Sequence, residues 1–382
     1  MQFEKRLESA LGKRREAGLI RSLSLASEMV DFTSNDYLGL ARDTELAALV
    51  RQRVLDAPAM LGSGGSRLLS GNSELAMELE AFLATYFKTD KALLYNSGYA
   101  ASLGLLSTLP QRGDTVLYDE LSHACIKEGI RLSSARYFSF RHNDVADLRK
   151  KILKASGQIF IVAESVYSMD GDLVPLHDMI DVARETGARI ILDEAHGLGV
   201  AGSEGKGLAL HAGLPEEIIA TVYTFGKAIG AHGACVAASE TVVDYLINFS
   251  RSFIYTTALP AHSLIAIYEA FRFFEKYPGK RQQLSENISY FNTVLTQKSG
   301  LFDNNSGAYW LSSNTAIQAF VYPGNDNVRR LARCIQDAGY DVRPILSPTV
   351  KRGYERLRVC LHAFNTRQET EALIETIKQH SA

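Results

Sequence analysis

One lysine, Lys227, has surroundings that suit covalent chemistry. It follows a short apolar run typical of a buried strand, and it lies among small residues in TFGKAIG, residues 224–230. A lysine amine that is removed from water loses its proton more easily, and the neutral amine can form a Schiff base with a carbonyl group. An ordinary surface lysine is the alternative interpretation. We favour a nucleophile because Asp193 ends another predicted strand 34 residues earlier.

Asp193 and His196 lie in LDEAHG, residues 192–197, where the predicted strand RIIL ends. In an open α/β sheet, ligands bind beyond the carboxyl ends of the strands. A carboxylate at that place could pair with a buried cationic nitrogen. The same letters resemble the DEAH box of a nucleotide-driven motor, and a capping aspartate is a simpler alternative. A motor also needs a Gly-Lys-Ser/Thr phosphate loop, which the sequence lacks.

Two glycine-containing segments could bind an anion through backbone N–H groups. NSGY, residues 96–99, follows the apolar run ALLY and precedes a helix start. Ser97 and Gly98 would therefore place donors at a helix N-terminus. GSGGS, residues 62–66, has no clear strand before it, and a tight or flexible turn is its simpler interpretation. NSGY is the better candidate for a phosphate site.

Two further strand ends carry polar groups. Ser122 and His123 follow the apolar run TVLY, and ESVYSMDGD, residues 164–172, follows QIFIVA. A lone histidine or serine at such a place is usually structural. Parallel strands, however, bring their carboxyl ends to one edge of a sheet. Four strand ends with polar groups therefore predict one shared site.

The elements that must position these residues are short apolar runs that alternate with helical patterns. The predicted strands are 92–95, 115–118, 136–140, 158–164, 189–194, 221–226 and 233–239. Helical patterns separate several of them, notably at 144–155 and 175–187. Continuous Val, Ile, Leu and Ala runs are typical of a parallel sheet with helices on both faces. The sequence thus predicts an α/β fold with a mostly parallel, seven-stranded central sheet.

Outside these strands, the spacing of helices and apolar runs is different. Three more helices are predicted, at 2–18, 73–87 and 260–277. The last of them ends at the helix breaker Tyr277-Pro278-Gly279. Apolar runs and helical patterns then alternate at 316–322, 326–338, 356–362 and 367–380. We therefore predict an N-terminal arm (1–40), a large domain (41–275) and a small C-terminal α+β domain (276–382).

The composition excludes several classes of protein. Of the 382 residues, 46% are apolar and 22% charged, and the formal net charge is −2. These values exclude a disordered chain and give no support for nucleic acid as a partner. The sequence has no run of about 18 apolar residues that could span a membrane. A charged N-terminus and four widely spaced cysteines predict no secretory signal, disulfide framework or metal centre, so a cytoplasmic location is expected.

Taken together, ten segments resemble, in order, the α-oxoamine synthases, which are pyridoxal-phosphate enzymes of the aspartate-aminotransferase fold, fold type I. The segments are SNDYLGL (34–40), GSGGSR (62–67), NSGYAA (96–101), LSHAC (121–125), FSFRHND (138–144), ESVYSMDGD (164–172), LDEAHGLGV (192–200), TFGKAIG (224–230), IYTTALP (254–260) and SPTV with RLRV (347–359). They cover nearly the whole chain. The resemblance implies fold type I and pyridoxal 5′-phosphate as the cofactor.

The resemblance also implies roles around that cofactor. Lys227 would form the Schiff base and later move protons at the substrate α-carbon. Asp193 would keep the pyridine nitrogen protonated, and His123 would stack on the ring. His196 and Ser168 would hydrogen-bond the phenolic oxygen. The phosphate end would be surrounded by Gly98, Tyr99 and Thr224, and reached by Thr257 of a neighbouring subunit.

On the substrate side, the resemblance assigns Arg358 to the amino-acid carboxylate, which it would hold through a bidentate pair. It places Arg21, Asn35 and Thr349, together with His123, in the substrate region. A site that needs a second subunit implies a homodimer. The implied reaction is the decarboxylative condensation of an amino acid with an acyl-CoA or an acyl-carrier-protein thioester.

Within the family, the compact length and GSGGSR are most similar to the branch that joins L-alanine to a pimeloyl thioester in biotin synthesis. Two features differ from that branch. Leu346 stands where some members carry an arginine, and 13 residues separate Arg21 from Asn35 where a longer hairpin is usual. A glycine C-acetyltransferase or a serine palmitoyltransferase-like enzyme therefore stays open. A non-catalytic relative is the alternative of another class, and it would be expected to lack Lys227, Asp193 or His123, all of which are present.

Overall fold

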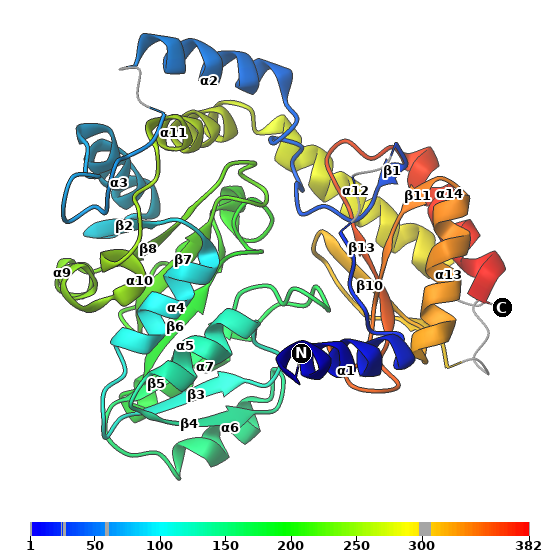
Figure 1. Ribbon diagram of the computed structural model, residues 1–382, viewed down its shortest axis with the longest axis horizontal. Helices are drawn as coiled ribbons and strands as arrows, with labels where there is room; N and C mark the ends of the chain where they lie inside the picture. The colour runs from blue at the N-terminus through cyan, green and yellow to red at the C-terminus, as the bar shows by residue number, and fades with distance from the viewer. Residues whose placement is uncertain (1, 24, 26–27, 58–60, 298–306, 382) are drawn as a thin grey trace.

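A seven-stranded sheet forms the centre of the larger of two lobes (Figure 1). The structure is a computed structural model that describes residues 2–23, 25, 28–57, 61–297 and 307–381. The strands of this sheet are β2 (Lys91–Tyr95), β3 (Thr115–Asp119), β4 (Arg136–Phe140), β5 (Ile159–Glu164), β6 (Arg189–Asp193), β7 (Ile218–Thr224) and β8 (Ala234–Ala238). Each overlaps one strand predicted from the sequence, so the predicted set is confirmed.

The strands lie in the order β2-β8-β7-β6-β5-β3-β4. Strands β4, β3, β5, β6 and β7 pair in parallel, whereas β8 is antiparallel to both of its neighbours. The sheet is therefore mostly parallel, as predicted, and β8 alone runs the other way. Because all the other strands share one direction, they end at the same edge. Glu164 and Asp193 lie opposite each other in the register of β5 and β6 at that edge.

Helices cover both faces of this sheet, because successive residues of its strands point to opposite sides. Strand β5 shows the alternation: Ile161 belongs to one buried apolar cluster and Val162 to another. The Val162 cluster contains residues of α4 (Gly98–Thr108), α5 (Ala124–Leu132) and α9 (Glu240–Phe249). The Ile161 cluster contains residues of α6 (Val145–Ile152) and α7 (Leu176–Thr186). A strand buried on both faces explains the continuous apolar runs.

The smaller lobe contains a four-stranded antiparallel sheet of order β12-β13-β10-β9. Its strands are β9 (Tyr309–Trp310), β10 (Ile317–Val321), β12 (Arg343–Ile345) and β13 (Arg356–Cys360). Its helices are α12 (Gly279–Gln297), α13 (Asn325–Asp337) and α14 (Arg367–Ser381). This arrangement confirms the predicted C-terminal α+β architecture. The domain boundaries at 40/41 and 275/276 stay a prediction.

Helix α12 was missed by the sequence analysis, which treated Tyr277-Pro278-Gly279 only as a breaker. The breaker does end α11 (Ala261–Lys276), but α12 begins at once. The carbonyl of Pro278 accepts hydrogen bonds from the backbone N–H groups of Arg281 and Gln282 (3.1 Å each). Proline lacks an N–H group, and the first N–H groups of a helix have no partner within it. The same proline can therefore end one helix and start the next.

The N-terminal arm contacts both lobes. Helix α1 (Gln2–Glu16) confirms the helix predicted at 2–18, and its apolar residues Phe3, Leu7 and Leu11 are exposed. Strand β1 (Val30–Asp31) pairs in parallel with β11 (Tyr340–Asp341) in the smaller lobe. The chain then crosses to α2 (Thr44–Asp56), which packs on α11. In the part of the chain that the structure describes, no helix combines the length and the apolar character that crossing a membrane requires.

Candidate active site

A cavity of about 300 Å³ lies where the strands of the large sheet end. The predicted site residues that line it are Asn35, Gly98, Tyr99, His123, Asp193, His196, Thr224 and Lys227. They lie at or just after the ends of four strands, β2, β3, β6 and β7, and Asn35 comes from the N-terminal arm. The cavity is also lined by Ser97, Cys125, Glu164, Ala195, Gly226, His232 and Gly233.

Lys227 lies in the wall of this cavity, three residues after β7. Burial lowers the pKa of Lys227 to about 8, although the carboxyl groups of Asp193 and Glu164 act in the opposite direction. At pH 7–8 a substantial fraction of the amine is therefore neutral, which is the form that attacks a carbonyl group. The roles of the site residues stay predictions, but the location of Lys227 suits a nucleophile.

The pH dependence of Lys227 can be measured in protein freed of cofactor. We expect its reductive methylation by formaldehyde and cyanoborohydride to reach half of its maximal rate near pH 8, because only the neutral amine reacts. Peptide mass spectrometry between pH 6 and 11 gives the rate for each lysine. The exposed Lys150, whose amine is not removed from water, is the matched control. A Lys227 profile that follows that of Lys150 would contradict the interpretation.

Asp193 is held as a hydrogen-bond acceptor at the end of β6. It is buried, and its Oδ1 accepts the backbone N–H of Ala195 (2.8 Å). The hydroxyl of Ser102, on α4, donates to Oδ2 (3.2 Å). These two hydrogen bonds fix the orientation of the carboxylate. Asp193 is thus able to stabilise a cationic nitrogen inside the cavity.

Glu164 is a site residue that the sequence analysis did not single out, although it named the segment 164–172. Burial and the neighbouring Asp193 raise the pKa of Glu164 to about 8. Its Oε1 accepts the backbone N–H of His123 (2.6 Å). The signal was present in the sequence, because Glu164 ends a buried strand just as Asp193 does.

His123 is the N-cap residue of α5, so its position depends on both β3 and that helix. Its Nδ1 accepts the backbone N–H of Cys125 (3.3 Å) and lies 2.9 Å from Sγ of the same residue. Burial lowers the pKa of His123, which favours a neutral ring at pH 7. A neutral imidazole at the cavity wall could stack on an aromatic ligand, as predicted.

Gly98 and Thr224 approach each other closely beneath the start of α4. A Cβ atom on Gly98 would lie 2.3 Å from Cγ2 of Thr224, so only glycine fits there. Ser97 caps α4 by accepting the backbone N–H of Ala100 (3.2 Å). The N-terminus of this helix lines the cavity, which suits a phosphate or another anion. Tyr99 lies at the same helix start, with its hydroxyl bonded to Glu128.

His196 and Arg358 are joined through Tyr37, which the sequence analysis quoted within SNDYLGL but gave no role. A 2.7 Å hydrogen bond joins the hydroxyl of Tyr37 to Nδ1 of His196. Burial, and then the charge of Lys227, lower the pKa of His196 well below its usual value. The neutral ring can therefore accept from Tyr37 at Nδ1, which leaves Nε2 as the donor. Arg358 donates from Nη2 to Oδ1 of Asn35 (3.0 Å) and more weakly to the Tyr37 hydroxyl (3.4 Å).

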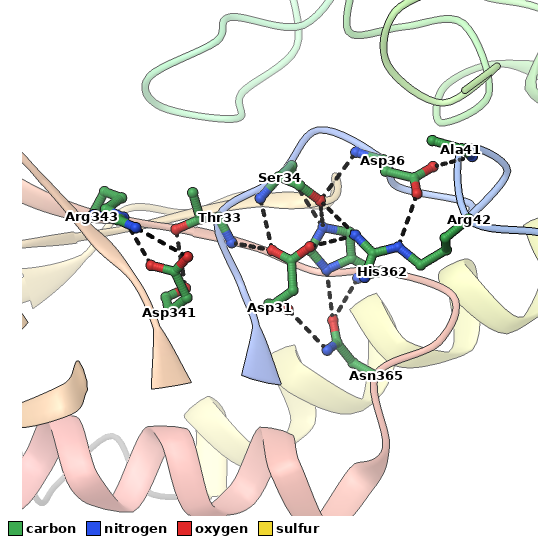
Figure 2. A network of polar contacts seen from close by, with 10 residues as sticks. All are labelled: Asp31, Thr33, Ser34, Asp36, Ala41, Arg42, Asp341, Arg343, His362 and Asn365. Atoms are coloured by element: carbon green, nitrogen blue, oxygen red, sulfur yellow. Dashed lines mark hydrogen bonds and ion pairs between the residues drawn. The ribbon is translucent and has the colours of Figure 1, made fainter. Parts of the chain in front are cut away.

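A polar network fixes the arm that carries Asn35 and Tyr37 (Figure 2). Oδ1 of Asp31 accepts the backbone N–H groups of Thr33 and Ser34 (2.9 Å each), and these bonds hold the pKa of Asp31 low despite burial. The Ser34 hydroxyl lies 3.1 Å from Nε2 of His362, just after β13. Arg42 pairs with Asp31 at 2.6 Å. The arm is therefore attached to the smaller lobe at the place where it reaches the cavity.

The other predicted site residues lie outside this cavity. The backbone carbonyl of Ser168 accepts a hydrogen bond from Nε of Arg358 (2.6 Å), and Arg358 also bonds Asn35 in the cavity wall. Thr257, Thr349 and Arg21 are exposed. The predicted role of Thr257 concerns the site of a second subunit. The roles of these residues stay predictions.

The chain is similar to one protein family and to several enzymes over nearly its whole length. Residues 27–377 match the family described as Aminotransferase class I and II. The 8-amino-7-oxononanoate synthase of Emericella nidulans is 39% identical, with 97% of this chain and 94% of that protein covered. Among solved structures, the 8-amino-7-oxononanoate synthase from Francisella tularensis is 28% identical, with a TM-score of 0.77 and coverage of 92% of this chain and 97% of that one. A serine palmitoyltransferase from S. paucimobilis, solved with pyridoxal phosphate and myriocin, is 26% identical, with a TM-score of 0.86 and coverage of 98% and 96%.

Proposed function

The chain belongs to the class I and II aminotransferase family, within which it is a pyridoxal-phosphate-dependent α-oxoamine synthase, and on this premise we propose that it is an 8-amino-7-oxononanoate synthase. It would join L-alanine to pimeloyl-CoA or a pimeloyl carrier protein, with release of the thiol carrier and CO2. The observation that carries the proposal is the cavity that unites Lys227, Asp193 and His196 beside Arg358. The names of the relatives at 35–39% identity support the choice of substrates.

The residues of the cavity fit pyridoxal 5′-phosphate. Lys227 supplies an amine for its aldehyde, and Asp193 supplies a carboxylate for its pyridine nitrogen. The start of α4, where Gly98 closely approaches Thr224, supplies backbone donors for its phosphate. When it is bound, the cofactor supplies an electron sink for the negative charge that develops at the substrate α-carbon. The donor set therefore matches the three polar ends of the cofactor.

The residues of the chain would then orient the substrate and move its protons. Arg358 holds the carboxylate of the amino acid, for which it exchanges its bond to Asn35. Lys227, with an amine that can be neutral near pH 8, takes the proton from the α-carbon. The α-carbon bonds to the thioester carbonyl, the thiol leaves, and the carboxyl group departs as CO2. Lys227 would return a proton to the product, and His196, in the cavity wall, would serve as a donor through its Nε2–H.

The proposal also includes a homodimer and a cytoplasmic location. Thr257 is exposed and lies next to Thr256, whose hydroxyl accepts from Asn96 at the end of β2 (3.0 Å). Thr257 is thus available to a second subunit close to its own large sheet. Size-exclusion chromatography with light scattering should give twice the chain mass of 42.0 kDa.

The substrates can be tested by a thiol-release assay that crosses three amino acids with four thioesters. L-alanine, glycine and L-serine are each combined with pimeloyl-, acetyl-, succinyl- and palmitoyl-CoA. We expect the highest kcat/KM for L-alanine with pimeloyl-CoA. Leu346 packs against a buried apolar cluster and supplies no cation for the pimeloyl carboxylate, so the other amino acid and thioester pairs are the competing candidates. Activity with glycine and acetyl-CoA, or with L-serine and palmitoyl-CoA, in place of that pair would replace the proposed activity with the corresponding one.

A further inference from the structure

A second polar cluster lies outside the cavity, where the two lobes meet. It surrounds residues 168–172, which we call the joint loop. The loop follows β5, and an isolated antiparallel β-bridge between Val166 and Leu173 joins the residues on either side of it. It includes Ser168, whose carbonyl accepts from Arg358. MDGD (169–172) in this loop and HND (142–144) both belong to segments that carry the family resemblance. Neither motif has a role in the proposed reaction.

On the side of the large lobe, His142 lies between two carboxylates. Its Nδ1 is 3.0 Å from Oδ1 of Asp119, and its Nε2 is 2.7 Å from Oδ2 of Asp172. Although burial opposes it, bonding to Asp119 and Asp172 raises the pKa of His142 to about 10. The ring is therefore a cation that bridges the end of β3 and the joint loop. Such charge-assisted hydrogen bonds are short and strong.

Asn143 reinforces this bridge. Its backbone N–H donates to Oδ2 of Asp119 (2.9 Å), and its side-chain Nδ2 donates to Oδ2 of Asp172 (2.6 Å). Its φ angle is +51°, in the left-handed region that asparagine tolerates better than most residues. That backbone turn lets adjacent residues 142 and 143 bind the same two carboxylates. The loop is thus attached to the large lobe by both residues.

On the side of the smaller lobe, β10 and β13 and the segment before β10 contact the same loop. The carbonyl of Gly171 accepts hydrogen bonds from the hydroxyls of Ser313 (2.9 Å) and Thr315 (2.8 Å). A Cβ atom on Gly171 would lie 2.1 Å from the carbonyl oxygen of Ile317, so the backbones are in close contact. Arg356, on β13, forms an ion pair with Asp170. Arg358 lies two residues further along β13, on the same face, and binds the loop at Ser168.

The cluster could be mistaken for a metal site, since ligand atoms of His142, Asp170 and Asp172 all lie within 4.8 Å of one another. Each of the three residues already has a charged partner within the chain. Both ring nitrogens of His142 are bonded to carboxylates, and Asp170 is paired with Arg356. The cluster is therefore an ion-pair network that joins the lobes.

We propose that His142 is a positioning residue that holds the joint loop through Asp172 and so sets the place at which Arg358 receives the substrate carboxylate. The loop continues directly from β5, the strand that ends in Glu164 beside Asp193. Its attachment thus relates Arg358, in one lobe, to the cofactor-binding residues in the other. This inference rests on the proposed function, because it assumes that Arg358 binds the amino acid. Catalysis is sensitive to displacements of about 1 Å in such groups.

The test compares His142→Gln and Asp172→Asn with the unchanged holoenzyme. Titration with L-alanine, glycine or L-serine alone, followed by cofactor absorbance, gives a Kd that needs no acyl donor. We expect each variant to raise the Kd of the preferred amino acid about tenfold, because a small displacement of Arg358 weakens a bidentate pair. Cofactor affinity should not change. The double variant should raise the Kd by much less than the product of the two single effects, because both substitutions remove the ion pair of His142 and Asp172.

A second readout needs neither substrate nor cofactor. Hydrogen–deuterium exchange of the protein freed of cofactor should become faster in residues 166–173 and 313–317 of both variants and stay unchanged in β6 and β7. The matched control is Glu185→Gln, which breaks the exposed ion pair of Arg149 and Glu185 between α6 and α7. It should change neither Kd nor exchange in those two segments. Unchanged exchange, or a lower melting temperature with an unchanged Kd, would overturn the inference. If the unchanged enzyme shows no thiol release with L-alanine and pimeloyl-CoA, that result would contradict the proposed function and not the positioning role of His142.

Discussion

Replacing Lys227 with alanine should lower turnover by about 10⁴-fold, the upper end of the range for losing a general acid–base group. The amine has two tasks: it holds the cofactor covalently and moves the proton at the substrate α-carbon. Its location in the cavity wall and its pKa of about 8 suit both. Thiol release under saturating substrates measures the loss, and the near-visible absorbance of the holoenzyme should shift because the Schiff base cannot form.

Two controls separate this effect from a general loss of structure. Lys227→Arg keeps a cation and most of the volume but supplies no nucleophilic amine, so it should be as inactive as Lys227→Ala. Lys150→Ala removes an exposed lysine from α6 and should leave turnover unchanged. A Lys227→Ala protein that turns over within tenfold of the unchanged enzyme would show that another group carries the chemistry.

The second large effect is expected for Asp193→Asn, which should lower turnover by about 10²- to 10³-fold, a magnitude typical of losing one electrostatic contact in a site closed to water. Asparagine keeps the size of the side chain but removes the negative charge that would stabilise a protonated pyridine nitrogen. The carboxylate accepts from both Ser102 and Ala195, and asparagine can accept from only one of them through its single oxygen.

The same variant has a readout that does not depend on turnover. Asp193 raises the pKa of Lys227, so removing its charge should lower that pKa below about 8. The methylation profile of Lys227 in cofactor-free Asp193→Asn should therefore move to lower pH. Asp178→Asn, at an exposed position of α7, should leave both the profile and turnover unchanged. A Lys227 profile that stays in place in Asp193→Asn would contradict the electrostatic coupling of the two residues.

The sequence predicted the large sheet well because its signal is local. Apolar runs such as QIFIVAE and RIILDE are continuous since both faces of β5 and β6 are buried, and this follows from their residues alone. Parallel strands share their carboxyl edge, so Asp193, His123 and Lys227 could be expected together before any coordinates were known. The family resemblance added their roles and the cofactor.

Other features could not be read from the chain. Glu164 ends a buried strand as Asp193 does, but its pKa of about 8 depends on its burial beside Asp193, and only the tertiary structure shows that burial. Helix α12 was missed because a proline can end one helix and begin another. The sequence assigns Tyr37 no role, because only the tertiary structure places its hydroxyl between His196 and Arg358.

What the sequence by itself determined is the set of chemical groups and the α/β class, because both depend on residue type and on periodicity over a few residues. Only the tertiary structure decided how the lobes meet. Arg358 hydrogen-bonds Asn35 in the cavity wall, 323 residues away in the chain, and the joint loop binds His142 on one side and Arg356 on the other. Contacts over such separations arise from packing between lobes, and no local pattern of residues encodes them.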